Sequence, residues 1–320
     1  MKKRILAILL VITLVVVLAA ACDGGGKKER QPGEQIRGVF ITQDFSNASQ
    51  AFSASEFQRL MGDYNAEIMV TGGDVDHNIA NIEQAIADKL DVIFINPNDS
   101  MAVIPALTRA RDAGIIVGMF SHVPPTDDFP CDFFVGSDDE LGGEQAGKFV
   151  SEKFPDGANF VEVGGQAGHS AATKRHDGFR KGIASNIIEL DSQFVPGPWT
   201  GSEARAIMED FLVMYEDQID IVWCHWDHGA AAVIEAVVAS GREASDIFII
   251  GVDGNSVGYQ AVKDGIQALS VGQSFTNMAA KSLELARQML DGGAAPQLMN
   301  WIPLDMVTID TWNTFPWPEW

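Results

Sequence analysis

The feature that most constrains the fold is a regular alternation of short apolar runs with longer amphipathic stretches, from Ile36 to Leu290. The apolar runs predict strands, and stretches such as Asn78–Lys89, where isoleucines recur at helical spacing, predict helices. The predicted strands are Ile36–Thr42, Glu67–Thr71, Val92–Asn96, Ile115–Phe120, Phe133–Gly136, Asn159–Val163, Ile221–His225, Ile247–Val252 and Leu269–Gln273. The predicted helices are Asn78–Lys89, Ala102–Ala113, Gly142–Lys153, Ser202–Tyr215, Gly229–Ser240, Val257–Asp264 and Thr276–Leu290.

Strands that alternate with helices of this length predict parallel sheets with helices on both faces. Several of the strands, such as Val92–Ile95, are continuously apolar, which is typical of strands buried on both faces. We therefore assign the chain to the α/β class. In such sheets a ligand crevice lies beyond the carboxyl ends of the strands, so the residues directly after each strand are the candidates for binding.

Those strand-end residues are polar or aromatic throughout. Any one of them is more often a turn or cap residue than a ligand contact, but the shared character of several strand ends favours a binding site. Asn, Asp and Gln side chains supply the fixed donors and acceptors that a hydroxyl-rich ligand needs. The candidates are Asn96, Ser121, His122, Trp226, Asp227, Asp253 and Gln273.

Four segments carry a resemblance to a known family. They are INPNDSMAV (Ile95–Val103), VGSDDELGGEQAG (Val135–Gly147), GGQAGHSAATKRHDGFRKGI (Gly164–Ile183) and IIGVDGN (Ile249–Asn255). In order and spacing, from about Ile36 to Asp305, the chain resembles the pentose and hexose branch of the periplasmic binding proteins, with a pattern close to ribose-binding proteins. The resemblance implies two Rossmann-like lobes joined by a three-crossover hinge, which close over a ligand without catalysis or cofactor.

The resemblance also implies individual site residues. The asparagine of the family's INP motif falls on Asn96, the arginine of its S-A-A-x-x-R segment on Arg175, and the aspartate of its G-x-D-G segment on Asp253. The glutamine at the second crossover falls on Gln273, and the aromatic that closes over the sugar from the second lobe on Trp199. Arginine and aspartate can form charge-assisted hydrogen bonds with hydroxyls, and an indole offers an apolar face to a sugar ring.

The chain departs from the family at three places. Ser121 and His122 stand where the family has an Asp-Arg pair, and Trp226 stands before Asp227 where the family commonly has asparagine. The usual aromatic run after the first strand is absent, and Phe45 is the candidate for the facing aromatic, with Phe52 as the alternative. We therefore expect a monosaccharide or polyol as ligand, with another aldose, a cyclic polyol or a more apolar sugar derivative at least as favoured as ribose.

The resemblance places residues 36–137 plus 275–295 in an N-terminal lobe and residues 138–274 plus 296–320 in a C-terminal lobe. It implies a monomeric protein that hands its solute to an ABC transporter permease. A sensory protein for a chemoreceptor or histidine kinase would use the same pocket, and a non-sugar solute such as a nucleoside or signalling furanone stays open. An extracellular enzyme is a remote alternative.

The first residues predict export. Three basic residues, Lys2 to Arg4, precede the uncharged run Ile5–Ala21, which is short for a membrane span and suits a secretory signal peptide over residues 1–21. Three alanines then precede Cys22, which resembles a lipoprotein cleavage site with lipid on the cysteine, although Leu18 lies one place further from it than usual. Plain cleavage near Ala21 and an uncleaved anchor are the alternatives. Residues 22–35, rich in Gly and charge, predict a flexible tether.

Charge and cysteine content narrow the possible partners. The net charge of −22 excludes nucleic acid and electrostatic attachment to anionic lipid. It also excludes, together with the leader, the transcriptional repressors that share this core. Besides Cys22 the chain has only Cys131 and Cys224, which are weak evidence for a disulfide.

Residue spacing argues against several more specific kinds of site, namely phosphate, calcium, metal and hydrolase sites. Gly164–Gly168 matches no phosphate-binding loop, and the Asp74 segment lacks the glycine and the twelfth-position carboxylate of a calcium loop. Cys224, His225 and Asp227 alternate along a strand, so they do not converge on a metal. His169 and Ser170 form no recognisable triad with a nearby aspartate, and Asp138–Glu140 is interpreted as a helix cap. The tail from Thr311 to Trp320, with three tryptophans, is expected to pack over the second lobe or the hinge, with docking of a partner as the alternative.

Overall fold

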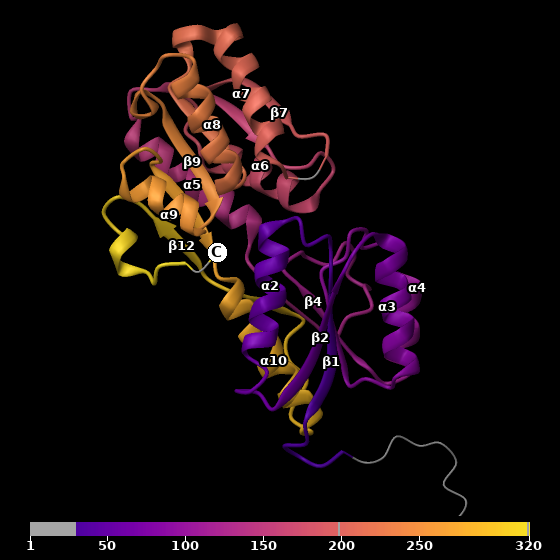
Figure 1. Ribbon diagram of the computed structural model, residues 1–320. Helices are drawn as coiled ribbons and strands as arrows, with labels where there is room; N and C mark the ends of the chain where they lie inside the picture. The colour runs from indigo at the N-terminus through magenta and orange to yellow at the C-terminus, as the bar shows by residue number, and fades with distance from the viewer. Residues whose placement is uncertain (1–29, 198, 319) are drawn as a thin grey trace, which may run out of the picture.

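The computed structural model describes residues 30–197, 199–318 and 320. The expected signal segment 1–21 and the expected lipid attachment at Cys22 lie outside the described residues. The chain forms two lobes, each built around its own six-stranded sheet with helices on both faces. The predicted α/β class with two parallel-sheet lobes is confirmed (Figure 1).

The first lobe has a sheet in which every neighbouring pair of strands is parallel, in the order β11-β5-β4-β3-β1-β2. Its strands are β1 (Ile36–Thr42), β2 (Ala66–Gly72), β3 (Val92–Ile95), β4 (Ile116–Phe120), β5 (Phe133–Gly136) and β11 (Met299–Trp301). Side chains alternate between the faces of a strand, so Val92 and Phe94 enter one apolar core and Ile93 and Ile95 the other. This explains the unbroken apolar run of β3.

The second lobe repeats the arrangement in the order β12-β10-β9-β8-β6-β7, and β12 is antiparallel to β10 while the other pairs are parallel. Its strands are β6 (Ala158–Gly164), β7 (Ile187–Phe194), β8 (Ile221–Cys224), β9 (Phe248–Asp253), β10 (Leu269–Gln273) and β12 (Leu304–Val307).

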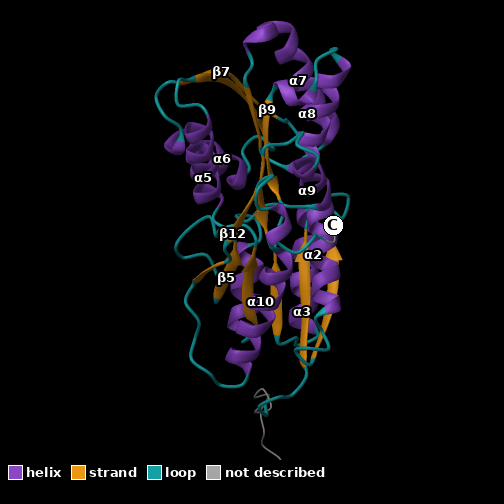
Figure 2. Cartoon of the chain, turned by 90° about the vertical axis from the view of Figure 1, so that its left-hand side faces the viewer, coloured by secondary structure: helices purple, strands orange, loops and turns teal. Residues whose placement is uncertain are grey.

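Helices cover both faces of each sheet. In the first lobe α2 and α10 share one core and α3 and α4 the other; in the second, α5 and α6 share one core and α7 and α8 the other. Figure 2 shows α5 and α6 on one side of the second sheet and α7 and α8 on the other. The helices are α2 (Ala48–Arg59), α3 (Val75–Ala87), α4 (Ile104–Asp112), α5 (Asp139–Lys153), α6 (Ser170–Gly182), α7 (Gly201–Tyr215), α8 (Asp227–Ala239), α9 (Ser256–Lys263) and α10 (Phe275–Leu290).

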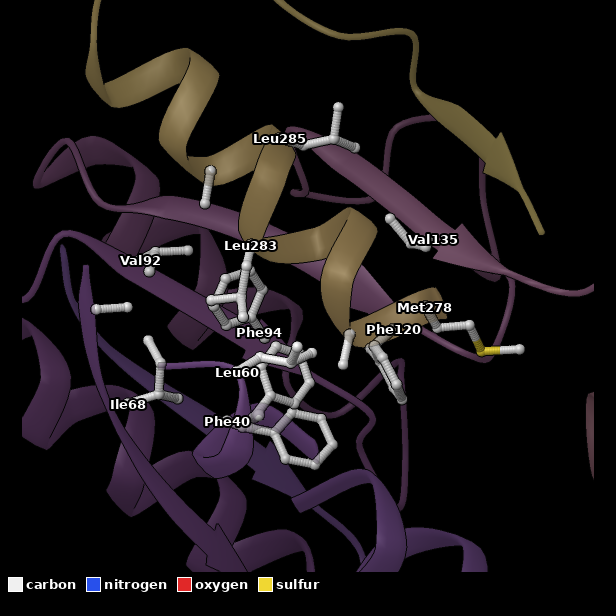
Figure 3. Close-up of a cluster of buried hydrophobic side chains, with 14 of the residues drawn as sticks. Phe40, Leu60, Ile68, Val92, Phe94, Phe120, Val135, Met278, Leu283 and Leu285 are labelled. Atoms are coloured by element: carbon white, nitrogen blue, oxygen red, sulfur yellow. The ribbon is translucent and has the colours of Figure 1, made fainter. Parts of the chain in front are cut away.

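The core of the first lobe joins segments that are far apart in the sequence. Helix α10 directly follows strand β10 of the second lobe, yet its Met278 and Leu283 pack on the phenylalanines of the first sheet (Figure 3). Phe40 and Phe120 meet edge to face with ring centroids 5.2 Å apart. Burial of large side chains of this kind contributes about 1.5–3 kcal/mol each, so α10 is firmly part of the first lobe.

The third crossover differs from the expectation. Residues 296–303 were expected in the C-terminal lobe, but β11 pairs in parallel with β5 of the first sheet. The pairing continues to Ile302, whose N–H donates to the carbonyl of Gly136 at 2.8 Å, and the Ile302 side chain is buried in the first core. The chain therefore crosses to the second lobe between Ile302 and β12, and β11 takes the place of β5 as an edge strand of the first sheet.

The described end of the expected tether is not free. Residues 30–35 pack on the first lobe: Arg30 forms an ion pair with Asp91 at 2.7 Å, and the N–H of Gly33 donates to Asp291 at 2.9 Å. Arg287 also donates to the carbonyl oxygen of Glu34 at 2.7 Å. The prediction of a flexible tether over residues 22–35 is thus wrong for residues 30–35. Their polar composition predicted flexibility, but their hydrogen-bond partners lie far away in the sequence and could not be recognised from it.

Candidate ligand-binding site

A cavity of about 370 Å³ lies between the two lobes, at the carboxyl ends of strands from both sheets. This volume is within the range of small-molecule sites, about 300–1,000 Å³. Its walls come from strand ends and from the first turns of helices in both lobes. They are formed by Gln43, Ser46, Asn47, Ala48, Ser49, Gln50, Ser121, His122, Asp139, His169, Ala171, Arg175, Trp199, Thr200, Gly201, Trp226, His228, Asp253, Gln273, Phe275 and Trp320.

Most of the sequence-predicted site residues meet in this cavity. The structure brings together Ser121, His122, Arg175, Trp199, Trp226, Asp253 and Gln273. Three others do not line it. Asn96 is fully buried beneath α2 and donates to Gln50 Oε1 at 2.8 Å, so the glutamine faces the cavity in its place. Asp227 is fully buried behind the loop after β9, and Phe45 is 42% exposed outside the cavity.

Arg175 is the cationic centre of the second-lobe wall. Its side chain is buried, its Nε donates to Asp139 Oδ1 at 2.8 Å, and one terminal nitrogen donates to the carbonyl oxygen of His225. Its guanidinium carbon lies 5.4 Å from the centre of the Trp199 ring. These contacts fix the guanidinium at the cavity wall, where it can donate charge-assisted hydrogen bonds to ligand oxygens.

Glycines explain why Asp139 and Arg175 meet. Helices α5 and α6 approach so closely that a Cβ on Gly143 would lie 2.4 Å from the Arg175 carbonyl oxygen, and one on Gly178 only 2.1 Å from that of Glu140. Only glycine permits this approach of two backbones. The first turn of α5 therefore lies against the first half of α6, which places the carboxylate beside the guanidinium.

Asp253 supplies the carboxyl group of the site. It is the last residue of β9 and has a φ of 120°, and Ser121, which directly follows β4 in the opposite lobe, has a φ of 65°. Such angles are costly for non-glycine residues and cluster at functional sites. Gln273 Nε2 donates to Asp253 Oδ1 at 3.3 Å. Burial raises the pKa of Asp253 to about 8, while the charge of Arg175 acts in the opposite direction.

Asp227 supports the turn that carries Asp253. Its carboxylate accepts from the N–H of Gly254 at 2.9 Å, from Ser270 Oγ at 2.7 Å and from Gln267 Nε2 at 2.8 Å. Burial raises the pKa of Asp227 to about 6, and these hydrogen bonds oppose the rise. The second aspartate predicted for the site therefore shapes the backbone and makes no contact with the cavity.

Aromatic rings form a continuous wall of the cavity. Trp199 meets Trp226 edge to face at 5.5 Å and His169 at 5.4 Å, and His169 meets His122 of the first lobe at 4.4 Å. The two lobes thus touch through a histidine pair. Burial lowers the pKa of both histidines, that of His169 to about 4, so both rings are neutral at neutral pH. Neutral rings and indoles suit the apolar faces of an uncharged ligand.

A buried network supports this wall from behind. Glu162 on β6 accepts from His225 Nε2 at 2.8 Å, from Arg180 at 2.9 Å and from Ser192 Oγ at 2.6 Å. Burial opposes ionisation of Glu162, but these donors hold its pKa below the usual range. His225 Nδ1 accepts from the N–H of Gly165 at 3.1 Å, so both ring nitrogens are used within the protein. His225 therefore positions the Gly165 loop, on which the Trp199 ring rests.

Sequence reasoning missed several lining residues. Asp138 caps α5 by accepting from Leu141 N at 3.1 Å, as interpreted, but its neighbour Asp139 lines the cavity. His169 precedes α6 within a segment already singled out for the resemblance. Gln50 lies in α2, which no periodic pattern indicated. Trp320 belongs to the tryptophan-rich tail, whose composition was the only signal.

The described part of the chain lacks a metal-ligand cluster, a membrane-spanning helix and a disulfide. Within residues 30–197, 199–318 and 320, no three His, Cys, Asp or Glu side chains are grouped as metal ligands. None of the helices in these residues is long and apolar enough to cross a membrane. Cys131 and Cys224 are buried in different lobes without a disulfide, and burial raises the pKa of the Cys131 thiol to about 11.

Comparison with known proteins agrees with this architecture. The model of the periplasmic binding protein domain matches residues 39–294. The ribose import binding protein of Salmonella typhimurium (strain LT2) is 30% identical over 72% of this chain and 75% of its own length. The D-xylose-binding periplasmic protein of Escherichia coli K12 is 26% identical over 70% of this chain and 68% of its own length.

Solved structures show the same fold. An ABC transporter solute-binding protein from Bacillus halodurans C-125, solved with bound myo-inositol, superposes with a TM-score of 0.80 at 22% identity, over 90% of this chain and 98% of its own. A galactofuranose-binding protein gives a TM-score of 0.81 at 24% identity, over 87% of this chain and 96% of its own. The chain therefore belongs to the periplasmic binding protein family, in its type I branch of ribose-binding-like proteins.

Proposed function

We propose that this protein captures a monosaccharide or cyclic polyol between its lobes and delivers it to the permease of an ABC transporter. The observation that carries the proposal is the cavity between the carboxyl ends of the two sheets, where Arg175 and Asp253 face indole and imidazole rings. Fixed polar groups can pair with hydroxyls while the rings cover C–H faces. The names of the relatives, which refer to ribose, xylose and myo-inositol, support the same class of solute.

The exchange of the family's Asp-Arg pair for Ser121 and His122 bears on the choice of solute. His122 is neutral because burial lowers its pKa, so the first-lobe wall offers a hydroxyl and an imidazole in place of two charges. With Gln43, Ser49 and Gln50, this wall consists of neutral polar groups. We infer that the cavity favours an uncharged polyhydroxylated solute over a sugar acid or sugar phosphate.

Thermal unfolding in the presence of candidate solutes tests this function. The protein, freed of any co-purified solute by unfolding and refolding, is heated with pentoses, hexoses, deoxysugars, inositols, linear polyols and matched sugar acids. We expect a stereospecific hit among the neutral solutes: at a hundredfold its dissociation constant a ligand adds about 2.7 kcal/mol, a shift of several degrees. A flat response would exclude simple sugars and direct the search to nucleosides and other solutes, and a response confined to acids would contradict the neutral first-lobe wall.

We further propose that the protein is anchored outside the cytoplasmic membrane through lipid on Cys22, after removal of residues 1–21. The support is the leader pattern alone. In the Cys22→Ala variant expressed in a lipoprotein-processing host, we expect the protein in the soluble fraction, whereas the unaltered chain sediments with membranes. If Cys22→Ala stays in the membrane fraction, the Ile5–Ala21 segment itself is the anchor.

A further inference from the structure

The tail after β12 is attached to the second lobe. Trp312 and Phe315 pack with Tyr259 and Val262 of helix α9, and Trp317 meets Tyr259 edge to face with ring centroids 5.9 Å apart. The Lys263 ammonium lies 5.2 Å from the Trp312 ring and 5.5 Å from the Trp317 ring. Each cation–π contact of this kind contributes a modest attraction. Together these contacts fix the path of the tail over α9.

Trp320 then reaches the other lobe. Its ring stacks on Phe52 of α2 at 5.6 Å with an interplanar angle of 13°, and meets Phe275 of α10 edge to face at 5.2 Å. Its carbonyl oxygen accepts from the N–H of Ser256, the first residue of α9, at 2.6 Å. One residue thus holds a backbone hydrogen bond to the second lobe and two ring contacts with the first.

The same indole belongs to the ligand cavity. Trp320, Phe275 and Gln273 line the interlobe cavity, and all three also line a second cavity of about 350 Å³ formed with the tail and α9. The ring therefore lies between the ligand site and this second cavity. The position of the chain end at the junction of the lobes is visible in Figure 1.

We propose that Trp320 is a ligand-binding residue that also latches the lobes together: its indole forms one wall of the interlobe cavity and ties the second lobe to Phe52 and Phe275 of the first. The proposal rests on the proposed function for its effect on affinity. Separation of the lobes has to break either the ring contacts or the hydrogen bond at Ser256. The latch therefore increases the fraction of protein in the arrangement that binds, and apparent affinity rises with that fraction.

Two measurements on Trp320→Ala and Trp320→Phe test the latch. Small-angle X-ray scattering of the unliganded proteins should give a larger radius of gyration for Trp320→Ala than for wild type. Titration calorimetry with the solute identified by the thermal panel should give a dissociation constant about tenfold weaker for Trp320→Ala, as expected for the loss of two aromatic contacts. Trp320→Phe, which keeps a ring, should fall between. The control is Trp301→Ala, which replaces an exposed tryptophan of β11, and this variant should match wild type in both measurements.

The outcomes separate this inference from the proposed function. A scattering curve of Trp320→Ala that coincides with wild type would overturn the latch, whatever solute binds. An affinity of Trp320→Ala within twofold of wild type would overturn the role of the indole in binding. If no solute of the panel binds wild type, the proposed function fails, and the scattering comparison still decides whether Trp320 holds the lobes together.

Discussion

The Asp253→Asn variant is expected to bind its solute about 10- to 100-fold more weakly than wild type, and to be more stable than wild type without solute at pH 8. The loss of affinity follows because the carboxyl group, with a pKa near 8, can donate through its O–H when protonated or accept through both oxygens when ionised, whereas the amide offers one acceptor oxygen and a fixed NH₂ donor. A ligand hydroxyl left unpaired in a buried site costs about 1–3 kcal/mol. The gain in stability follows because the folded protein holds this carboxyl in a buried site beside Asp227 and Asp139.

The pH dependence gives the second readout of this variant. Burial raises the pKa of Asp253 to about 8 in the folded protein, from an ordinary value near 3.8. Between these values the folded state holds a proton that the unfolded state has lost, so this group's contribution to stability falls as the pH rises from about 4 through 8. The free energy of unfolding of Asp253→Asn, relative to wild type, should therefore increase over this range in urea titrations.

A matched control is Asp210→Asn on the exposed face of α7, which should leave both affinity and pH dependence unchanged. Wild-type affinity in Asp253→Asn would remove this residue from the binding site. A stability difference between Asp253→Asn and wild type that does not vary with pH would show that burial does not shift the titration of the carboxyl.

The second large effect is expected from Arg175→Met. Removal of one partner of a buried ion pair leaves the other charge uncompensated, which costs about 3–5 kcal/mol. Here Asp139 would lose the Nε donor at 2.8 Å, and the carbonyl oxygen of His225 would lose its donor. We expect a large drop in the midpoint of urea unfolding, and no measurable solute binding because the cationic donor of the cavity is gone.

A double variant separates the two effects. Arg175→Met combined with Asp139→Asn removes both charges, so most of the lost stability should return while binding stays absent. Arg205→Met, which breaks an exposed ion pair with Glu209 on α7, serves as the surface control and should change little. A double variant as unstable as Arg175→Met would show that the uncompensated carboxylate is not the cause.

The sequence predicted strands well where they are buried on both faces. The boundaries of β5 match the prediction because its apolar run, FFVG, ends where the strand ends. The boundaries of β10 also match, although its segment LSVGQ is not continuously apolar. Strand β7 was missed: it lies at the sheet edge, and its segment IIELDSQF is mostly half-buried or exposed. Helix α2 was missed because polar side chains such as Gln50 and Glu56 take up much of its buried face.

The candidate site was predictable at the strand ends and less so elsewhere. Topology alone brings Asp253 and Gln273 to one edge, because adjacent parallel strands end together. Asn96 has the same position at a strand end, but α2 covers it, and the covering helix was not predicted. Asp139 and His169 lie at helix starts, where a polar residue is normally a cap. Only the packing of α5 on α6 brings Asp139 beside Arg175 and into the cavity wall.

The order of the strands also has a consequence for how the polypeptide acquires its structure. The first sheet receives its last strand, β11, from residues 299–301, and the second sheet receives β12 from residues 304–307. A chain that emerges from its N-terminal end, from a ribosome or through a translocation pore, therefore exposes the open edges of β5 and β10 until residues 299–307 have emerged. Unpaired edges of this kind invite pairing with other chains. The two lobes consequently reach completion nearly together, once both strands are available, and pairings as distant as Met299 with Phe134 make that step slow.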